Sequence, residues 1–150
     1  MSIYTLGHII AMVDAIEKNI KQRRWLKKLK ASGDPEQLLE AARIYDGKKK
    51  YREAFDCYRQ SASKGNKEAQ YELALCYDMP KGCEQDLSKA FQLCLDSAKN
   101  GVIEAMERVG MYYENGIGTV KDTESALLWY REAAKNGNRL AIRRLKNFEK

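Results

Sequence analysis

The sequence predicts an all-α fold, an open solenoid of stacked antiparallel helix hairpins. The chain is similar to itself at an offset of 36 residues, and a repeat of this length is typical of helix pairs that bury their apolar faces on neighbouring pairs. Only two prolines occur in 150 residues, so long helices are permitted almost everywhere. The columns that share the offset are Gly65, Gly101 and Gly137; Ala69, Ala105 and Ala141; Ala54, Ala90 and Ala126; Ala62, Ala98 and Ala134; and Phe55, Phe91 and Leu127.

Residues 1–34 are predicted to form a degenerate leading pair of helices. A backward step of 32 residues from Gly65, the offset that the shorter first repeat requires, leads to Gly33. WLKKLKASGD (25–34) then overlays WYREAAKNGN (129–138). The end of this leading segment therefore resembles the end of a repeat.

Two sets of apolar residues support a pair of helices there. On one continuous helix the two sets would point in almost opposite directions. The first set is Ile9, Val13, Ile16 and Ile20, and the second, which we expect in the repeat core, is Trp25, Leu26 and Leu29. We therefore predict a break near residues 19–22.

Three repeats follow over residues 35–66, 67–102 and 103–138. In the third, IEAMERVGMYYENG and DTESALLWYREAAKNG both carry apolar residues at helical spacing. The connector NGIGTVKD lies between them and ends on Asp122, a good helix N-cap, and Gly137 falls where a left-handed C-cap is needed. Residues 139–150 repeat only the first helix of a unit, as expected of a capping helix.

Composition and charge exclude several classes of protein. The apolar run at residues 9–13 is not preceded by a basic residue and is interrupted by Asp14 and Glu17, unlike a signal peptide. No stretch reaches the 18 or more apolar residues of a spanning helix. We expect a soluble, cytoplasmic protein without membrane insertion. The net charge of +6 is concentrated in residues 1–32, and the remainder is nearly neutral.

The cysteines and the single histidine give no pattern for a metal site or for catalysis. Cys57, Cys76, Cys83 and Cys94 contain no C-x2-C pair, so we expect free thiols, mostly buried, with Cys83 reachable in a connector. NGIGTVKD lacks the preceding strand and the G-K-[ST] ending of a phosphate loop. We predict no enzyme activity, no cofactor, no metal and no small-molecule substrate.

The segment VGMYYENGIGTVKDTESALLWYREAAKNGN (109–138) resembles the Sel1-like repeat, a relative of the tetratricopeptide repeat. The resemblance is strong in the third unit, good in the second and partial in the first, whose connector is four residues shorter. It implies a right-handed superhelix that works as a protein-protein interaction module in an adaptor or scaffold role.

In tetratricopeptide-like arrays the first helix of each hairpin lines the concave face, where ligands are usually held. Transferred by the alignment, fifteen positions are expected to bind a partner: Glu36, Leu39, Glu40, Arg43, Asp46, Glu68, Tyr71, Glu72, Leu75, Asp78, Glu104, Glu107, Arg108, Met111 and Glu114. Nine of them are acidic and two are basic. A surface of one prevailing sign attracts the opposite sign, so we expect a basic or amphipathic peptide segment of another protein, with Tyr71, Leu75 and Met111 as apolar anchors.

The stretch KNIKQRRWLKKLK forms a separate basic patch: Lys21, Arg23, Arg24, Lys27 and Lys28. Phosphate contacts with nucleic acid, an anionic membrane surface and the acidic surface of a partner are all compatible with it. The expected burial of Trp25, Leu26 and Leu29 disfavours a membrane-inserting helix. Two alternative functions remain, a small inhibitor or immunity-type protein that blocks a nuclease or toxin, and a nucleic-acid-associated accessory protein that uses this basic segment.

Overall fold

A computed structural model describes residues 3–148, with side chains from residue 7 onward. This range contains eight α-helices and no strand, so the predicted all-α class is confirmed. The helices are α1 (Ile3–Ser32), α2 (Pro35–Gly47), α3 (Tyr51–Ser63), α4 (Lys67–Asp78), α5 (Leu87–Lys99), α6 (Ile103–Asn115), α7 (Thr123–Lys135) and α8 (Arg139–Phe148).

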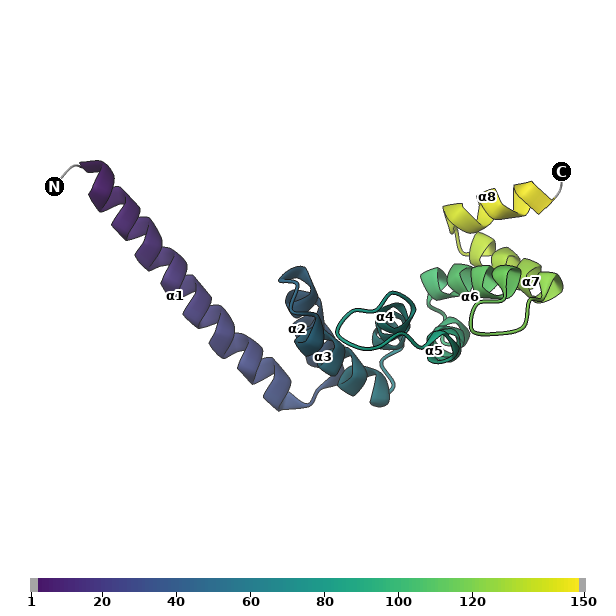
Figure 1. Ribbon diagram of the computed structural model, residues 1–150, viewed down its shortest axis with the longest axis horizontal. Helices are drawn as coiled ribbons and strands as arrows, with labels where there is room; N and C mark the ends of the chain where they lie inside the picture. The colour runs from purple at the N-terminus through teal and green to yellow at the C-terminus, as the bar shows by residue number, and fades with distance from the viewer. Residues whose placement is uncertain (1–2, 149–150) are drawn as a thin grey trace.

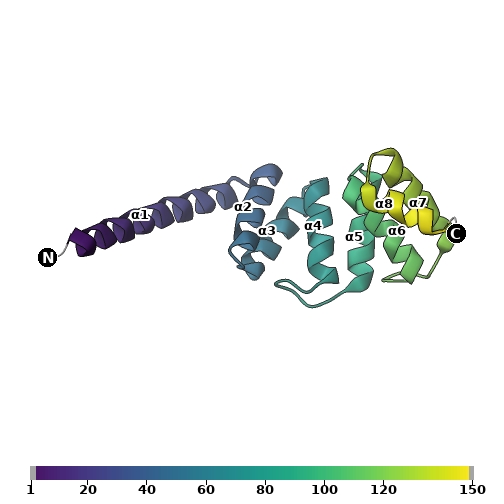
Figure 2. The same ribbon diagram turned by 90° about the horizontal axis from the view of Figure 1, so that it is seen from above.

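The helices form a curved array of hairpins. α2 pairs with α3, α4 with α5 and α6 with α7, and each hairpin packs on the next. α8 packs on α7 at one end, and α1 packs on α2 at the other. In Figure 1, α2, α4 and α6 lie toward the hollow of the crescent, and Figure 2 shows the same helices stacked in a row with α1 extending away from them.

Short-range signals in the sequence set the ends of these helices. Side-chain oxygens accept hydrogen bonds from backbone N–H groups at five helix starts, as N-caps do: Asp34, Asn66, Asp86, Asp122 and Asn138. The glycine that closes each repeat has a left-handed backbone, with φ of 85° at Gly65, 90° at Gly101 and 85° at Gly137. The chain therefore turns at the same place in every repeat.

The small-residue columns allow the helices to approach closely. Ala54, Ala90 and Ala126 are at most 2% exposed. At Gly110 on α6, an added Cβ would lie 2.6 Å from the ring of Tyr130 on α7, so that aromatic ring fills the space beside bare backbone. Alanine and glycine thus set the distance between helices, and large aromatic side chains fill the core between them.

The predicted pair of helices in residues 1–34 is wrong, because α1 is one continuous helix. No glycine or proline lies between residues 8 and 32, so nothing in the backbone favours a break near residues 19–22. Leu26 and Leu29 are buried against the array as expected, at 4% and 6% exposure, but Trp25 is 41% exposed. Only the last turns of α1 are therefore part of the packed array.

Candidate functional site

The helices on the hollow side bring the fifteen predicted partner-binding residues onto neighbouring helices, but not all of them are accessible. Leu39 and Glu107 are buried, with 2% and 8% exposure. The exposed members are Glu36, Glu40, Arg43 and Glu104, and the half-buried members are Asp46, Glu68, Tyr71, Glu72, Leu75, Asp78, Arg108, Met111 and Glu114. The accessible surface is therefore narrower than the predicted set.

Arginine side chains pair with several of the predicted carboxylates. The Arg108 guanidinium lies 3.6 Å from the Asp78 carboxylate, and Arg144, 36 residues further along, lies 3.3 Å from Glu114. The Tyr112 hydroxyl also donates to Asp78 at 3.0 Å. These contacts repeat from one hairpin to the next, so they tie successive first helices together and neutralise part of the expected acidity.

Arg108 on α6 and Arg144 on α8 occupy equivalent positions, 36 residues apart. The equivalent position on α4 is Glu72, so this arginine is absent there. Burial raises the pKa of the Glu72 carboxyl, and the nearby Asp46 carboxylate adds to the increase while Arg43 and Lys81 oppose it. Asp46 pairs instead with Lys81, at 3.6 Å between Nζ and Oδ1. This end of the concave face therefore has an excess of carboxylates.

Four of the nine predicted carboxylates form neither an ion pair nor a side-chain hydrogen bond within residues 7–148: Glu40, Glu68, Glu72 and Glu104. Glu36, by contrast, accepts a hydrogen bond from the Asn66 amide at 2.7 Å. Along α4, the apolar parts of Tyr71 and Leu75 alternate with Glu68 and Glu72 at helical spacing. This arrangement can bind a chain that carries both cations and apolar side chains.

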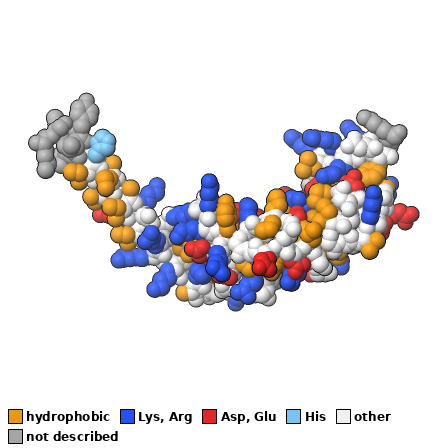
Figure 3. Space-filling view, in the orientation of Figure 1, with side chains coloured by type: hydrophobic (Ala, Val, Ile, Leu, Met, Phe, Trp, Pro, Cys, Tyr) orange, Lys and Arg blue, Asp and Glu red, His pale blue; other side chains and the backbone are white. Residues whose placement is uncertain are grey.

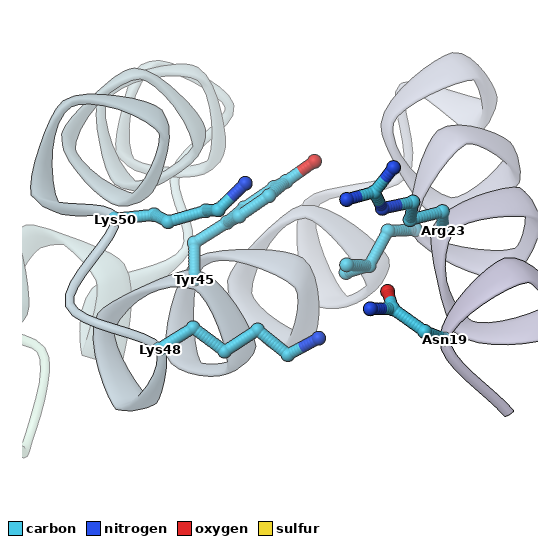
Figure 4. A pocket seen from close by; sticks show the side chains of 6 residues that line it. Asn19, Arg23, Tyr45, Lys48 and Lys50 are labelled. Carbon is cyan, nitrogen blue, oxygen red and sulfur yellow. The ribbon is translucent and has the colours of Figure 1, made fainter. Parts of the chain in front are cut away.

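The five residues of the predicted basic patch are all exposed on α1. One of them, Arg23, lines a cavity of about 380 Å³ between α1 and the turn after α2, together with Lys48 and Lys50 (Figure 4). Asn19, Leu26 and Tyr45 complete the lining, which contains no carboxylate. Lys48 Nζ donates to Gln22 Oε1 and so connects the turn to α1.

Sequence reasoning missed Lys48 and Lys50, although the short connector DGKKK was visible. It also missed Arg144, although an offset of 36 residues from Arg108 leads directly to it.

Comparison with known protein families assigns the repeats. The model of the Sel1 repeat matches residues 41–66, 67–102 and 103–138. The chain belongs to the Sel1 repeat family. The second and third Sel1 repeats each contain one complete hairpin, α4 with α5 and α6 with α7. The first match begins inside α2, upstream of the short connector.

Solved structures of other Sel1 repeat proteins are similar to this chain. A Sel1 repeat protein from Oxalobacter formigenes is 29% identical, with a TM-score of 0.73 over 81% of this chain and 51% of that chain. The protein c5321, described as a protective antigen of uropathogenic Escherichia coli, is 26% identical, with a TM-score of 0.76 over 83% of this chain and 27% of that one. This chain thus spans about half and about a quarter of their lengths.

Helicobacter pylori cysteine rich protein B shares the fold at 18% identity, with a TM-score of 0.62 over 85% of this chain and 95% of that chain. No curated protein matches the sequence. Sel1 repeats generally mediate protein-protein interaction.

The thiols of this Sel1 repeat array are free, and three of them are buried, as predicted: Cys57, Cys76 and Cys94. Cys83 is only partly buried and its thiol donates to the Cys76 carbonyl at 3.2 Å. Among the described residues no cluster of His, Cys, Asp or Glu has the arrangement of a metal site. None of the described helices combines the length and apolar character needed to cross a bilayer.

Proposed function

We propose that this Sel1 repeat protein is an adaptor that holds a basic or amphipathic peptide segment of a partner protein against its concave face. Four carboxylates carry the proposal, because they form no ion pair within the described part of the chain: Glu40, Glu68, Glu72 and Glu104, on three successive first helices. Cations on the peptide neutralise these carboxylates, and its apolar side chains contact Tyr71, Leu75 and Met111.

The paired carboxylates have a different role in this proposal. Asp78, Glu107 and Glu114 bind Arg108 and Arg144, so they hold the first helices in register and leave little free charge for a ligand. A ligand that needs carboxylates is therefore expected to bind along α2, α4 and the first turn of α6, where Glu104 lies. Glu72, on α4, replaces the arginine of later repeats.

The test uses a fluorescein-labelled helical peptide with leucine on one face and lysine on the other. We expect saturable binding to the full chain, measured by fluorescence anisotropy, and at least about ten-fold weaker binding after Glu72→Lys with Glu104→Lys. Glu84→Lys with Glu132→Lys is the matched control, because it makes the same charge change in the connector before α5 and on α7. An equal loss of affinity in both double variants would show that the peptide is held only by long-range charge attraction. Unchanged affinity in the Glu72→Lys, Glu104→Lys variant would contradict the concave-face site.

A further inference from the structure

The N-terminal half of α1 carries an apolar stripe that no other described side chain covers. Its members lie at helical spacing and are each about half exposed: Ile9 49%, Val13 49%, Ile16 55% and Ile20 45%. Ile10 and Met12 flank them, with 54% and 64% exposure. Figure 3 shows these hydrophobic side chains along the part of α1 that projects beyond the array.

Such a segment is only marginally stable as a helix in water by itself. Helices of about 15 residues are marginal in isolation, since most helix stability in proteins comes from burial of an apolar face. Contiguous exposed apolar surface of this kind marks a contact with a partner or a membrane. The stripe therefore predicts a second surface, separate from the concave face.

The same face of α1 becomes cationic in its C-terminal half. Steps of three and four residues continue from Ile20 to Arg23, Lys27 and Lys30, all of which are exposed. Arg24 and Lys28 lie beside them, and Arg23 is joined across the cavity by Lys48 and Lys50. One side of a single helix thus presents apolar side chains first and positive charges next (Figure 3).

This order disfavours a second copy of the chain as the occupant. A parallel pair of helices would place the cations at Arg23, Lys27 and Lys30 against their own counterparts. An antiparallel pair would overlap only over the apolar half, which is shorter than the three to four heptads typical of a coiled coil. An anionic bilayer, in contrast, offers an apolar interior and negative headgroups along one plane.

We propose that the face of α1 from Ile9 to Lys30 docks on the surface of an anionic phospholipid bilayer. The apolar half lies at the boundary between headgroups and acyl chains, and Arg23, Lys27 and Lys30 lie on the headgroup phosphates. The helix remains in the plane of the surface and does not cross the bilayer. The array then projects from the membrane with its concave face open.

Vesicle flotation of the full chain tests this surface. We expect binding to vesicles of phosphatidylcholine mixed with an equal part of phosphatidylglycerol, and much weaker binding to phosphatidylcholine alone. Each cation near an anionic surface contributes about five-fold to partitioning. Arg23→Gln, Lys27→Gln and Lys30→Gln together should therefore weaken binding on the order of 100-fold. Lys99→Gln, Arg131→Gln and Lys146→Gln remove the same charge elsewhere and should leave most of the binding intact.

A second pair of variants tests the apolar half. Ile9→Gln, Val13→Gln and Ile16→Gln together should abolish flotation. Met79→Gln, Val120→Gln and Leu128→Gln, at positions of 53% to 83% exposure outside α1, should not. Because the stripe lies outside the packed array, the thermal unfolding of the array should be unchanged in the first variant.

Three outcomes would overturn the proposal. The first is no binding to anionic vesicles at low salt, and the second is equal loss in test and control variants. The third is self-association in sedimentation that the stripe variant removes while vesicles bind nothing, which would identify a second copy as the occupant. The peptide assay of the concave face uses no lipid. A negative result for one proposed surface therefore leaves the proposal for the other surface standing.

Discussion

Arg144 on α8 donates a hydrogen bond from Nε to the carboxylate of Glu107 on α6, at 2.9 Å. The Glu107 side chain is only 11% exposed, and the Arg144 guanidinium also lies 5.6 Å from the centre of the Tyr130 ring on α7. One arginine of the last helix therefore contacts both helices of the preceding hairpin. Together with the apolar packing of Ala141 and Leu145 in the core, this contact holds α8 on the array.

Replacement of Arg144 by glutamine should destabilise the chain by about 1–3 kcal/mol, because it leaves the buried Glu107 carboxylate without its partner. The measurement is urea unfolding followed by circular dichroism. Arg143→Gln, at the exposed neighbouring position, makes the same charge change and should alter stability by less than about 0.5 kcal/mol. Equal effects at both positions would mean that net charge, rather than the contact with Glu107, determines the result.

The connector glycine Gly118 has a second role besides its left-handed backbone, with φ of 66°. A Cβ at this position would overlap the carbonyl oxygen of Leu87 at the start of α5. We expect Gly118→Ala to cost more than about 3 kcal/mol, since it combines backbone strain with a clash against a neighbouring hairpin. Gly101→Ala, at φ of 90° with open space around it, should cost only about 1–2 kcal/mol. Similar losses of stability would contradict the close approach at Gly118.

Much of the fold was predictable because each repeat meets the same local requirement at the same position. Gly65, Gly101 and Gly137 all turn the chain with a positive φ, and the alanine column at Ala54, Ala90 and Ala126 is buried in every hairpin. A column of identical small residues thus reports one backbone geometry repeated along the chain.

The predicted break in α1 is wrong for a physical reason. The spacing of apolar residues indicates which side of a helix is apolar, but it does not indicate where the backbone bends. Ile16 and Leu29 point in different directions on one straight helix, one toward solvent and the other toward the array. Leu29 packs in the array, whereas Ile16 is 55% exposed. A change of apolar face was therefore interpreted as a break in the helix.

The charge of the concave face was predicted only in part, because the residues that neutralise it come from other units. Glu107 and Arg144 are 37 residues apart, and Asp78 and Arg108 are 30 apart. The acidic positions on one face do not by themselves indicate which arginines from other repeats pair with them. The repeat offset does relate Arg108 to Arg144, so the second arginine was detectable from the sequence.

Glu72 provides a prediction about pH. Its pKa in the folded chain is raised above the ordinary value of 4.5, mainly by burial, so the folded state disfavours the charged carboxylate. Glu72→Gln should therefore stabilise the chain at pH 7. The advantage should shrink as the pH falls through the raised pKa and vanish below about 4.5, where the carboxyl is protonated in both states.

Urea unfolding of the wild-type chain and the Glu72→Gln variant across this pH range measures the difference. Glu104→Gln, at an exposed position on α6, serves as the control and should change stability little at any pH. A Glu72→Gln variant that is less stable than wild type at pH 7 would show that Arg43 and Lys81 outweigh the cost of burial.

The thiols should separate into one reactive group and three protected groups. Burial raises the pKa of Cys76 and of Cys94 to about 12, and Cys57 is fully buried, so these three need local or global opening before they react. Burial also raises the pKa of Cys83, but this residue is only partly buried in the connector. With an aromatic disulfide reagent we expect one thiol to react first and the other three on the order of 1,000-fold more slowly. Cys83→Ser should remove the fast phase and leave the slow phase unchanged, whereas a fast phase that persists in this variant would place one of the other cysteines at the surface.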